Sequence, residues 1–316
     1  MSKLAYIFPG QGSQFVGMGK DLFEGSAAAR DFYNRADTQL GVSLSRICFD
    51  GPEGELKQTK NTQPAIFLHS VILTRLMPKE IVAMAAGHSL GEYSALVFAG
   101  SLSFEDGLNL VRLRGELMQK AGEEQRGTMA AVLGIDAGVL DGICREAAMA
   151  GVVQCANYNS PGQIVISGSV EGVRKAMELA KSRGAKLVKE LVVSGAFHSP
   201  LMESAKAGLR AALQKAHIKD AAFPVYANVT GRPVRVAEEI RKLLEEQLTS
   251  AVLWESSVQN MIADGASSFV EIGPGKVLQG LLKRINGSVG SRGVEKFLDV
   301  AGAAAERANV TVDVKA

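Results

Sequence analysis

A serine between two closely spaced glycines follows a short apolar run and precedes a helix-like segment. The run IVAMAA covers residues 81–86, and the pentapeptide GHSLG follows directly at 87–91. A strand that turns sharply into a helix around an exposed serine needs these glycines, because strained backbone angles and close strand–helix contact leave no room for a Cβ. The pattern therefore predicts that Ser89 projects from the tip of the turn, where a nucleophile would sit. A tight turn with a polar tip is the alternative interpretation.

The backbone around this serine supplies candidate oxyanion donors. The first N–H groups of a helix lack intrahelical partners and lie at the positive end of its dipole, so Leu90 N–H can donate to a developing oxyanion. The glycine-rich loop at 9–20 fits neither G-x-G-x-x-G nor the P-loop pattern. Close backbone approach to an anion, with Gln11 N–H as a second donor, is one use of such a loop, and a plain turn is the other.

Composition excludes several classes of protein. With 316 residues, 47% of them hydrophobic and 22% charged, the chain has the make-up of a soluble globular protein of two domains, or of one large α/β domain with an insertion. No apolar stretch approaches the roughly 18 residues of a membrane span. The net charge of +2 and the absence of a dense basic run argue against nucleic-acid binding. Three cysteines without a C-x-x-C pair argue against a disulfide framework or a zinc site, and favour a cytoplasmic location.

Short apolar runs alternate with helix-period segments, which predicts an α/β fold with a mostly parallel sheet covered by helices. Between about residues 128 and 193 the order changes to β-α-β-β-α-β, which is that of a ferredoxin-like unit. We therefore expect a large subdomain formed by residues 1–126 and 195–316, and a ferredoxin-like small subdomain formed by 127–194. Two lobes usually enclose a cleft.

A serine hydroxyl needs a base to become nucleophilic, and His198 is the preferred candidate. It lies just past the end of a predicted strand, at a sheet edge where ligands of α/β folds gather. Of the other histidines, we expect His88 to point away from the serine, His69 to be buried and His217 to be solvated. A lone histidine is usually structural, and no acidic residue between Ser89 and His198 stands out as the third member of a triad.

Arg114 lies in a helical segment that begins with the capping box Ser103-x-x-Asp106. Arg112 has Glu116 four residues on, as expected of a surface ion pair. The neighbours of Arg114 at helical spacing are instead apolar, namely Leu110, Val111, Leu117 and Met118. A guanidinium on a buried stripe should meet a carboxylate, either of the protein or of a ligand. In the second case, bidentate pairing would select a dicarboxylic acyl group over plain acyl groups.

Seven ordered motifs together form a specific pattern. They are PGQGSQ at 9–14, NTQPAIF at 61–67, GHSLGE at 87–92, RG at 114–115, NYNSPGQ at 157–163, GAFHSPLM at 195–202 and EIGPGKVL at 271–278. From about residue 6 to 285, the chain resembles the malonyl-CoA:acyl carrier protein transacylases of bacterial fatty-acid synthesis. The resemblance implies an α/β-hydrolase-like core with a ferredoxin-like insertion.

The resemblance also implies roles for individual residues. Ser89 would carry the malonyl group, His198 would be the base and Arg114 would hold the malonyl carboxylate. The backbone N–H groups of Gln11 and Leu90 would form the oxyanion hole. Malonyl-CoA and acyl carrier protein would be the two substrates of a ping-pong cycle, with no metal or tightly bound cofactor.

Further residues are implied in supporting roles. The main-chain carbonyl of Gln247 would orient the histidine, which accounts for the missing acidic residue, although this chain has Ser-Ala-Val at 250–252 where the family often has Asn-Pro-Val. Gln63 and His88 would line the pocket. Phe197 resembles the bulky residue that leaves little room for an α-methyl branch, so malonyl would be preferred over methylmalonyl.

Two other functions compete with this interpretation: a serine hydrolase or thioesterase of the same fold, and a non-catalytic subunit that binds the carrier protein. Because acyl carrier proteins are acidic, a basic rim could steer docking. Its candidate residues are Lys186, Lys189, Lys283 and Arg284. A merely solvated charged surface is equally compatible with these four positions.

Overall fold

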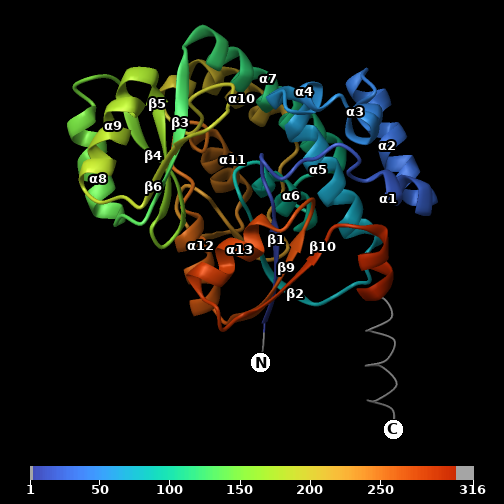
Figure 1. The fold of residues 1–316 in the computed structure, drawn as a ribbon. Coiled ribbons are helices and arrows are strands. Elements are labelled where there is room, and N and C mark those ends of the chain that lie inside the picture. Colours follow the sequence, from blue (N-terminus) through green and yellow to red (C-terminus); the bar gives the residue numbers. More distant parts are fainter. Residues whose placement is uncertain (1–2, 304–316) are drawn as a thin grey trace.

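The computed structural model describes residues 3–303 and has a mixed α/β architecture with two separate sheets (Figure 1). The larger sheet has the strand order β10-β9-β1-β2-β7-β8, and all its neighbours are parallel except β7 and β8. Its strands are β1 (Lys3–Phe8), β2 (Val82–Gly87), β7 (Val225–Tyr226), β8 (Pro233–Val234), β9 (Ala266–Ile272) and β10 (Gly290–Val294).

Helices bury both faces of this sheet. Tyr6 and Phe8 of β1 point into a large core, whereas Ala5 and Ile7 point into a smaller core on the other face. The large core is built with α1 (Lys20–Gly25), α2 (Ala27–Leu40), α3 (Leu44–Asp50), α4 (Glu53–Leu56), α5 (Thr59–Leu76), α6 (Gly91–Phe98), α7 (Phe104–Glu124), the 3₁₀ turn η1 (Pro200–Met202), α10 (Glu203–Lys215) and α11 (Ala237–Glu246). The small core is built with α12 (Trp254–Ala263) and α13 (Val277–Ile285).

The second sheet is antiparallel and has the order β4-β5-β3-β6. Its elements follow the chain as β3 (Gly127–Leu133), α8 (Ala137–Ala147), β4 (Val153–Ser160), β5 (Gln163–Ser169), α9 (Val170–Ser182) and β6 (Leu187–Glu190). This is the order and pairing of a ferredoxin-like unit, so the expected fold class is confirmed. Figure 1 shows the unit, with α8 and α9, to one side of the parallel sheet. Subdomain boundaries at 126/127 and 194/195 stay a prediction.

Two details differ from the sequence-based expectation. The strand expected over 185–195 ends at Glu190, because the chain then leaves the sheet and Ser194 Oγ lies 2.7 Å from Thr59 Oγ1 of α5. His198 therefore reaches the cleft on a loop, not at the end of a strand of the parallel sheet. The glycine-rich stretch after Gly287, which gave no sequence signal, contains strand β10 at the sheet edge.

Candidate active site

The serine stands in a strained turn between β2 and α6. Ser89 has φ 49°, a left-handed conformation that costs a non-glycine residue free energy. A Cβ on Gly87 would lie 1.9 Å from the carbonyl carbon of Gly91, and a Cβ on Gly91 would lie 2.1 Å from the Phe8 carbonyl oxygen. Only glycine fits at either position, so the two glycines allow strand, turn and helix to pack closely enough to expose the hydroxyl.

The structure brings His198 to this hydroxyl across 109 residues of chain. Ser89 Oγ lies 2.8 Å from His198 Nε2, and His198 Nδ1 lies 2.8 Å from the main-chain oxygen of Gln247. A carbonyl can only accept, so Nδ1 carries the proton and Nε2 is free to accept one. Burial, and next the nearby Arg114 cation, lower the pKa of His198 to about 3. The imidazole is therefore neutral near pH 7.

Arg114 lies on α7 with 1% of its surface exposed, directed at the serine. Its Nη1 donates to Gln63 Oε1 at 2.8 Å, and its Nη2 donates to Gln247 Oε1 at 2.8 Å and to Ser89 Oγ at 3.2 Å. The face of the Tyr93 ring lies 5.8 Å from the guanidinium carbon. All its hydrogen-bond acceptors among residues 3–303 are uncharged, and its Nε has no partner there. The site thus holds a buried cation without a carboxylate bonded to it.

The two candidate oxyanion donors lie at one edge of the sheet. Strands β1 and β2 are parallel and Phe8 pairs with Gly87, so the loops that carry Gln11 and Leu90 leave the sheet side by side. Within the described part of the chain, neither backbone N–H has a hydrogen-bond partner, and both residues line the cavity above Ser89. These free donors make an oxyanion site possible.

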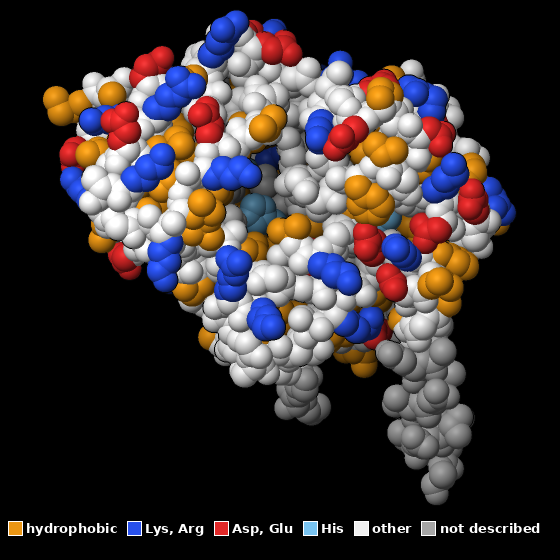
Figure 2. Space-filling view, in the orientation of Figure 1, with side chains coloured by type: hydrophobic (Ala, Val, Ile, Leu, Met, Phe, Trp, Pro, Cys, Tyr) orange, Lys and Arg blue, Asp and Glu red, His pale blue; other side chains and the backbone are white. Residues whose placement is uncertain are grey.

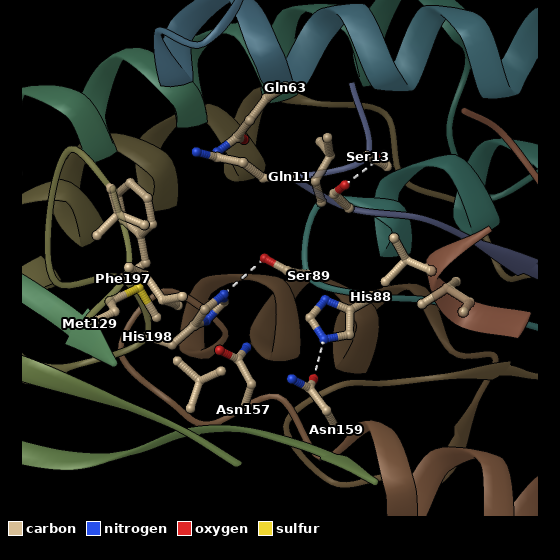
Figure 3. Close-up of a pocket in the computed structure, with 18 of the residues that line it drawn as sticks. Gln11, Ser13, Gln63, His88, Ser89, Met129, Asn157, Asn159, Phe197 and His198 are labelled. Atoms are coloured by element: carbon tan, nitrogen blue, oxygen red, sulfur yellow. Dashed lines mark hydrogen bonds between the residues drawn. The ribbon is translucent and has the colours of Figure 1, made fainter. Parts of the chain in front are cut away.

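A cavity of about 260 Å³ connects these groups (Figure 3). Gln63, His88 and Phe197, the three residues expected in the pocket wall, all line it. His88 Nε2 is directed away from the serine and lies 2.8 Å from Asn159 Oδ1. The rest of the wall is largely apolar, and includes Met118, Met129, Val165, Leu191 and Val193.

Several polar residues of the site were not singled out from the sequence. Asn159 and Asn157 come from β4 of the small sheet, although both stand in the NYNSPGQ motif. Asn228 follows β7, and its Oδ1 accepts from Ser89 N at 2.6 Å. Glu92 is buried under the serine, within the GHSLGE motif. The motifs were a usable signal for three of these residues, whereas nothing in the sequence marked Asn228.

Other residues occupy the structural positions expected of them. Asp106 N donates to Ser103 Oγ at 2.9 Å, which caps α7. Arg112 pairs with Glu116 at 2.6 Å. It also donates at 3.1 Å to Lys60 O, the carbonyl that loses its helical partner because Pro64 has no N–H.

The remaining histidines lie outside the pocket lining. His69 is buried and its Nε2 lies 2.9 Å from Glu295 O, whereas His217 is exposed. Among residues 3–303, no group of three or more His, Cys, Asp or Glu side chains is arranged to hold a metal ion. In the same range, no helix has the length and apolar character that crossing a membrane requires.

The fold and this site define an acyl transferase. Residues 5–300 match the acyl transferase domain family, and the chain belongs to it. It is 48% identical over 289 residues to the malonyl CoA-acyl carrier protein transacylase of Bacillus subtilis (strain 168), covering 90% of this chain and 91% of that protein. The crystal structure of the acyl-carrier-protein-S-malonyltransferase from Bartonella henselae has a TM-score of 0.92 at 41% identity, covering 95% and 98% of the two chains.

A second solved structure includes a bound partner. It is the complex of a type II PKS acyl-carrier protein with its malonyl-transacylase, PlMCAT, which matches with a TM-score of 0.91 at 39% identity. The match covers 96% of this chain and 99% of that one. The family match over residues 5–300 includes every residue of the site described above.

Proposed function

We propose that this protein transfers the malonyl group of malonyl-CoA to the phosphopantetheine thiol of acyl carrier protein in fatty-acid synthesis. The observation that carries the proposal is the buried Arg114 cation beside a serine–histidine pair, because it gives a serine acyltransferase a reason to prefer an acyl group with its own carboxylate. The names of the relatives point to the same donor and acceptor.

The first half-reaction forms a malonyl ester. His198 Nε2 takes the proton of Ser89 Oγ while this oxygen bonds to the thioester carbonyl carbon. The N–H groups of Gln11 and Leu90 stabilise the tetrahedral oxyanion, and Arg114 holds the far carboxylate. The C–S bond then breaks, and the proton on His198 passes to the departing CoA thiolate.

The second half-reaction repeats these steps with a different thiol. The phosphopantetheine thiol gives its proton to His198 and attacks the ester, and the proton then returns to Ser89 Oγ as the ester bond breaks. The main-chain oxygen of Gln247 keeps the imidazole in the tautomer that both half-reactions need. In both half-reactions, His198 accepts the proton and then donates it.

The proposal includes a preference for malonyl over methylmalonyl groups and a cytoplasmic location. Phe197 is a bulky side chain in the pocket wall, 6% exposed, which supports the first. The free thiols of Cys48, Cys144 and Cys155 are compatible with the second. We further propose that the large subdomain consists of residues 1–126 and 195–316 and the small one of 127–194.

Intact-mass measurement after brief incubation with malonyl-CoA tests the proposal. The wild-type chain should gain one malonyl group and Ser89→Ala none, and added holo acyl carrier protein should discharge the ester. Discharge to free malonate at the same rate without carrier would instead identify a hydrolase. A wild-type chain that binds carrier protein but gains no mass would identify a non-catalytic subunit.

A further inference from the structure

A carboxylate with no place in this chemistry lies buried under the nucleophile. Glu92 stands in the first turn of α6 and is 2% exposed. Its Oε2 accepts hydrogen bonds from Asn228 N at 3.0 Å and from Gln247 Nε2 at 2.8 Å. Both of these donors are uncharged. Burial of a carboxylate without an ion-pair partner is costly, so its position next to the active serine calls for a physical reason.

The two residues that Glu92 binds also hold the backbone of the serine. Asn228 Oδ1 accepts from Ser89 N at 2.6 Å, and Gln247 Nε2 donates to Ser89 O at 3.1 Å. Asn228 is tied in turn to the Gly87 carbonyl through its Nδ2 at 2.7 Å. Since Ser89 has a left-handed φ, surrounding contacts must impose its conformation, and these bonds hold its N–H and its carbonyl.

Gln247 extends the network to the base and to the cation. Its main-chain oxygen is the partner of His198 Nδ1, and its side-chain Oε1 accepts from Arg114 Nη2. A carboxylate accepts only, so Glu92 requires the amide nitrogen of Gln247 on its own side and leaves the amide oxygen facing Arg114. The buried charge thus favours one orientation of a side-chain amide that contacts the Ser89 backbone and the Arg114 guanidinium, while the main-chain oxygen of the same residue contacts His198.

We propose that Glu92 is a positioning residue whose ionised carboxylate, through Gln247 and Asn228, fixes the Ser89 backbone, the His198 ring and the Arg114 guanidinium for acylation. This inference rests on the proposed function, because acylation of the serine is its readout. Glu92 itself touches neither substrate nor the reacting atoms.

If Glu92 must be ionised to position the site, the acylation rate depends on pH. Burial raises the pKa of Glu92 to about 7, while the hydrogen bonds from Asn228 and Gln247 and the charge of Arg114 on α7 oppose the rise. Tyr93, the next residue along α6, stays neutral because burial raises its pKa also. Below about pH 7, Glu92 gains a proton and its two hydrogen bonds lose their charge assistance, which roughly halves their strength. Acylation should therefore slow as pH falls.

The base does not account for such an acid limb. The pKa of His198 lies at about 3, so it stays neutral across this range. Burial also lowers the pKa of His88, the other titratable group in the pocket wall. The phosphates of CoA do titrate nearby, and a malonyl thioester of N-acetylcysteamine, which has no phosphate, removes this contribution.

The test measures the single-turnover rate at which this thioester acylates the full-length enzyme. Intact-mass spectrometry monitors the reaction at several pH values from about 5.5 to 8.5. Wild-type acylation should fall about tenfold as pH drops through 7. Glu92→Gln, which mimics the protonated acid, should acylate at the low rate at every pH. The matched control is Glu80→Gln, since Glu80 is a half-buried carboxylate bonded to Tyr6 and Arg292 at the opposite end of β2, and it should follow the wild-type profile.

Two outcomes overturn the inference: a wild-type profile without the limb, or a Glu92→Gln enzyme with the wild-type rate and limb. Circular dichroism identifies a Glu92→Gln chain that fails to fold, and the wild-type profile with its Glu80→Gln control then decides alone. Absence of any acyl-serine in the wild type is a different failure, because it rejects the proposed function and not the role of Glu92.

Discussion

Arg114 Nη2 lies 3.2 Å from Ser89 Oγ, so the buried cation and the proposed nucleophile form a single site. The hydrogen-bond acceptors of the guanidinium in the described chain are amide and hydroxyl oxygens, so no anion is bonded to it directly. In the proposed cycle, a short acyl group that ends in a carboxylate would give the guanidinium a directly bonded anion when it is esterified to the serine. Lysine and arginine side chains also surround the hollow above the site (Figure 2).

Replacing Arg114 by Ala should separate malonyl transfer from acetyl transfer. Loss of a buried, charge-assisted pair costs about 2–5 kcal/mol, so kcat/KM for malonyl transfer should fall by about 30- to 5,000-fold. Acetyl transfer, which has no carboxylate to lose, should change by less than about tenfold. Arg112→Ala, on the same helix but bonded to Lys60 O and Glu116, should affect both acyl groups alike. Equal losses for the two acyl groups in Arg114→Ala would contradict a carboxylate clamp.

Because the turn around Ser89 is closely packed, an added methyl group should destabilise the protein at Gly91 but not at Gly142, a glycine with free space around it. Gly91→Ala places a Cβ about 2.1 Å from Phe8 O, an approach that backbone atoms cannot accept. We expect about 2–4 kcal/mol lower free energy of unfolding, with loss of acylation. Gly142→Ala in α8, where the nearest atom is Arg145 Nη2 at 3.8 Å, should instead stabilise by about 0.5–1 kcal/mol. Chemical denaturation measures both, and a Gly91→Ala chain as stable as wild type would contradict the packing argument.

Local sequence signals account for the elements that position the nucleophile. The apolar run before GHSLG and the capping box at Ser103 depend on neighbours within a few residues, so β2, α6 and α7 could be predicted directly. Strand β10 could not, because GSRGV contains two glycines and only one buried residue, Val294, and it forms a strand through pairing with β9.

The site itself depends on contacts between distant segments. The sequence favoured His198 as the base, but for a strand-end position that the structure does not have, and its 109-residue separation from Ser89 carries no spacing signal. The main-chain carbonyl of Gln247 cannot be inferred from residue type at all, and came from the family resemblance. The Asn228 side chain acts through hydrogen bonds to the backbone atoms of Ser89 and Gly87, which leave no trace in sequence periodicity.

The basic rim predicts a salt-dependent second half-reaction. Its four members, Lys186, Lys189, Lys283 and Arg284, are exposed, and Arg284 is bonded to Gln163 of the pocket wall. Changing all four to Gln should lower kcat/KM for holo acyl carrier protein about tenfold or more at low salt, and the difference should shrink as salt rises. Acylation by the phosphate-free thioester should be unchanged.

Removal of two lysine charges away from the rim tests whether the position of the charges matters. Both Lys219 and Lys215 are exposed; Lys219 N donates to Ser101 O beyond the far end of α6 from Ser89, and Lys215 ends α10. Gln at both positions should leave carrier kinetics and their salt response as in wild type. A rim variant with an unaltered salt response would show that the four charges are only solvated surface.

Buried His69 predicts a loss of stability in acid. Its Nε2 donates to Glu295 O, and burial lowers its pKa to about 4. The unfolded chain, with a histidine pKa of about 6.5, binds a proton between these values when the folded chain does not, so up to about 3 kcal/mol present above pH 6.5 is lost by pH 4. In His69→Gln, a side-chain amide N–H replaces the imidazole donor and does not titrate. The free energy of unfolding of this variant should therefore fall less between about pH 6.5 and pH 4 than that of the wild type. The control variant His217→Gln, at an exposed position, should follow the wild type. Parallel wild-type and His69→Gln curves in denaturant titrations at several pH values would show that His69 is protonated without unfolding the chain.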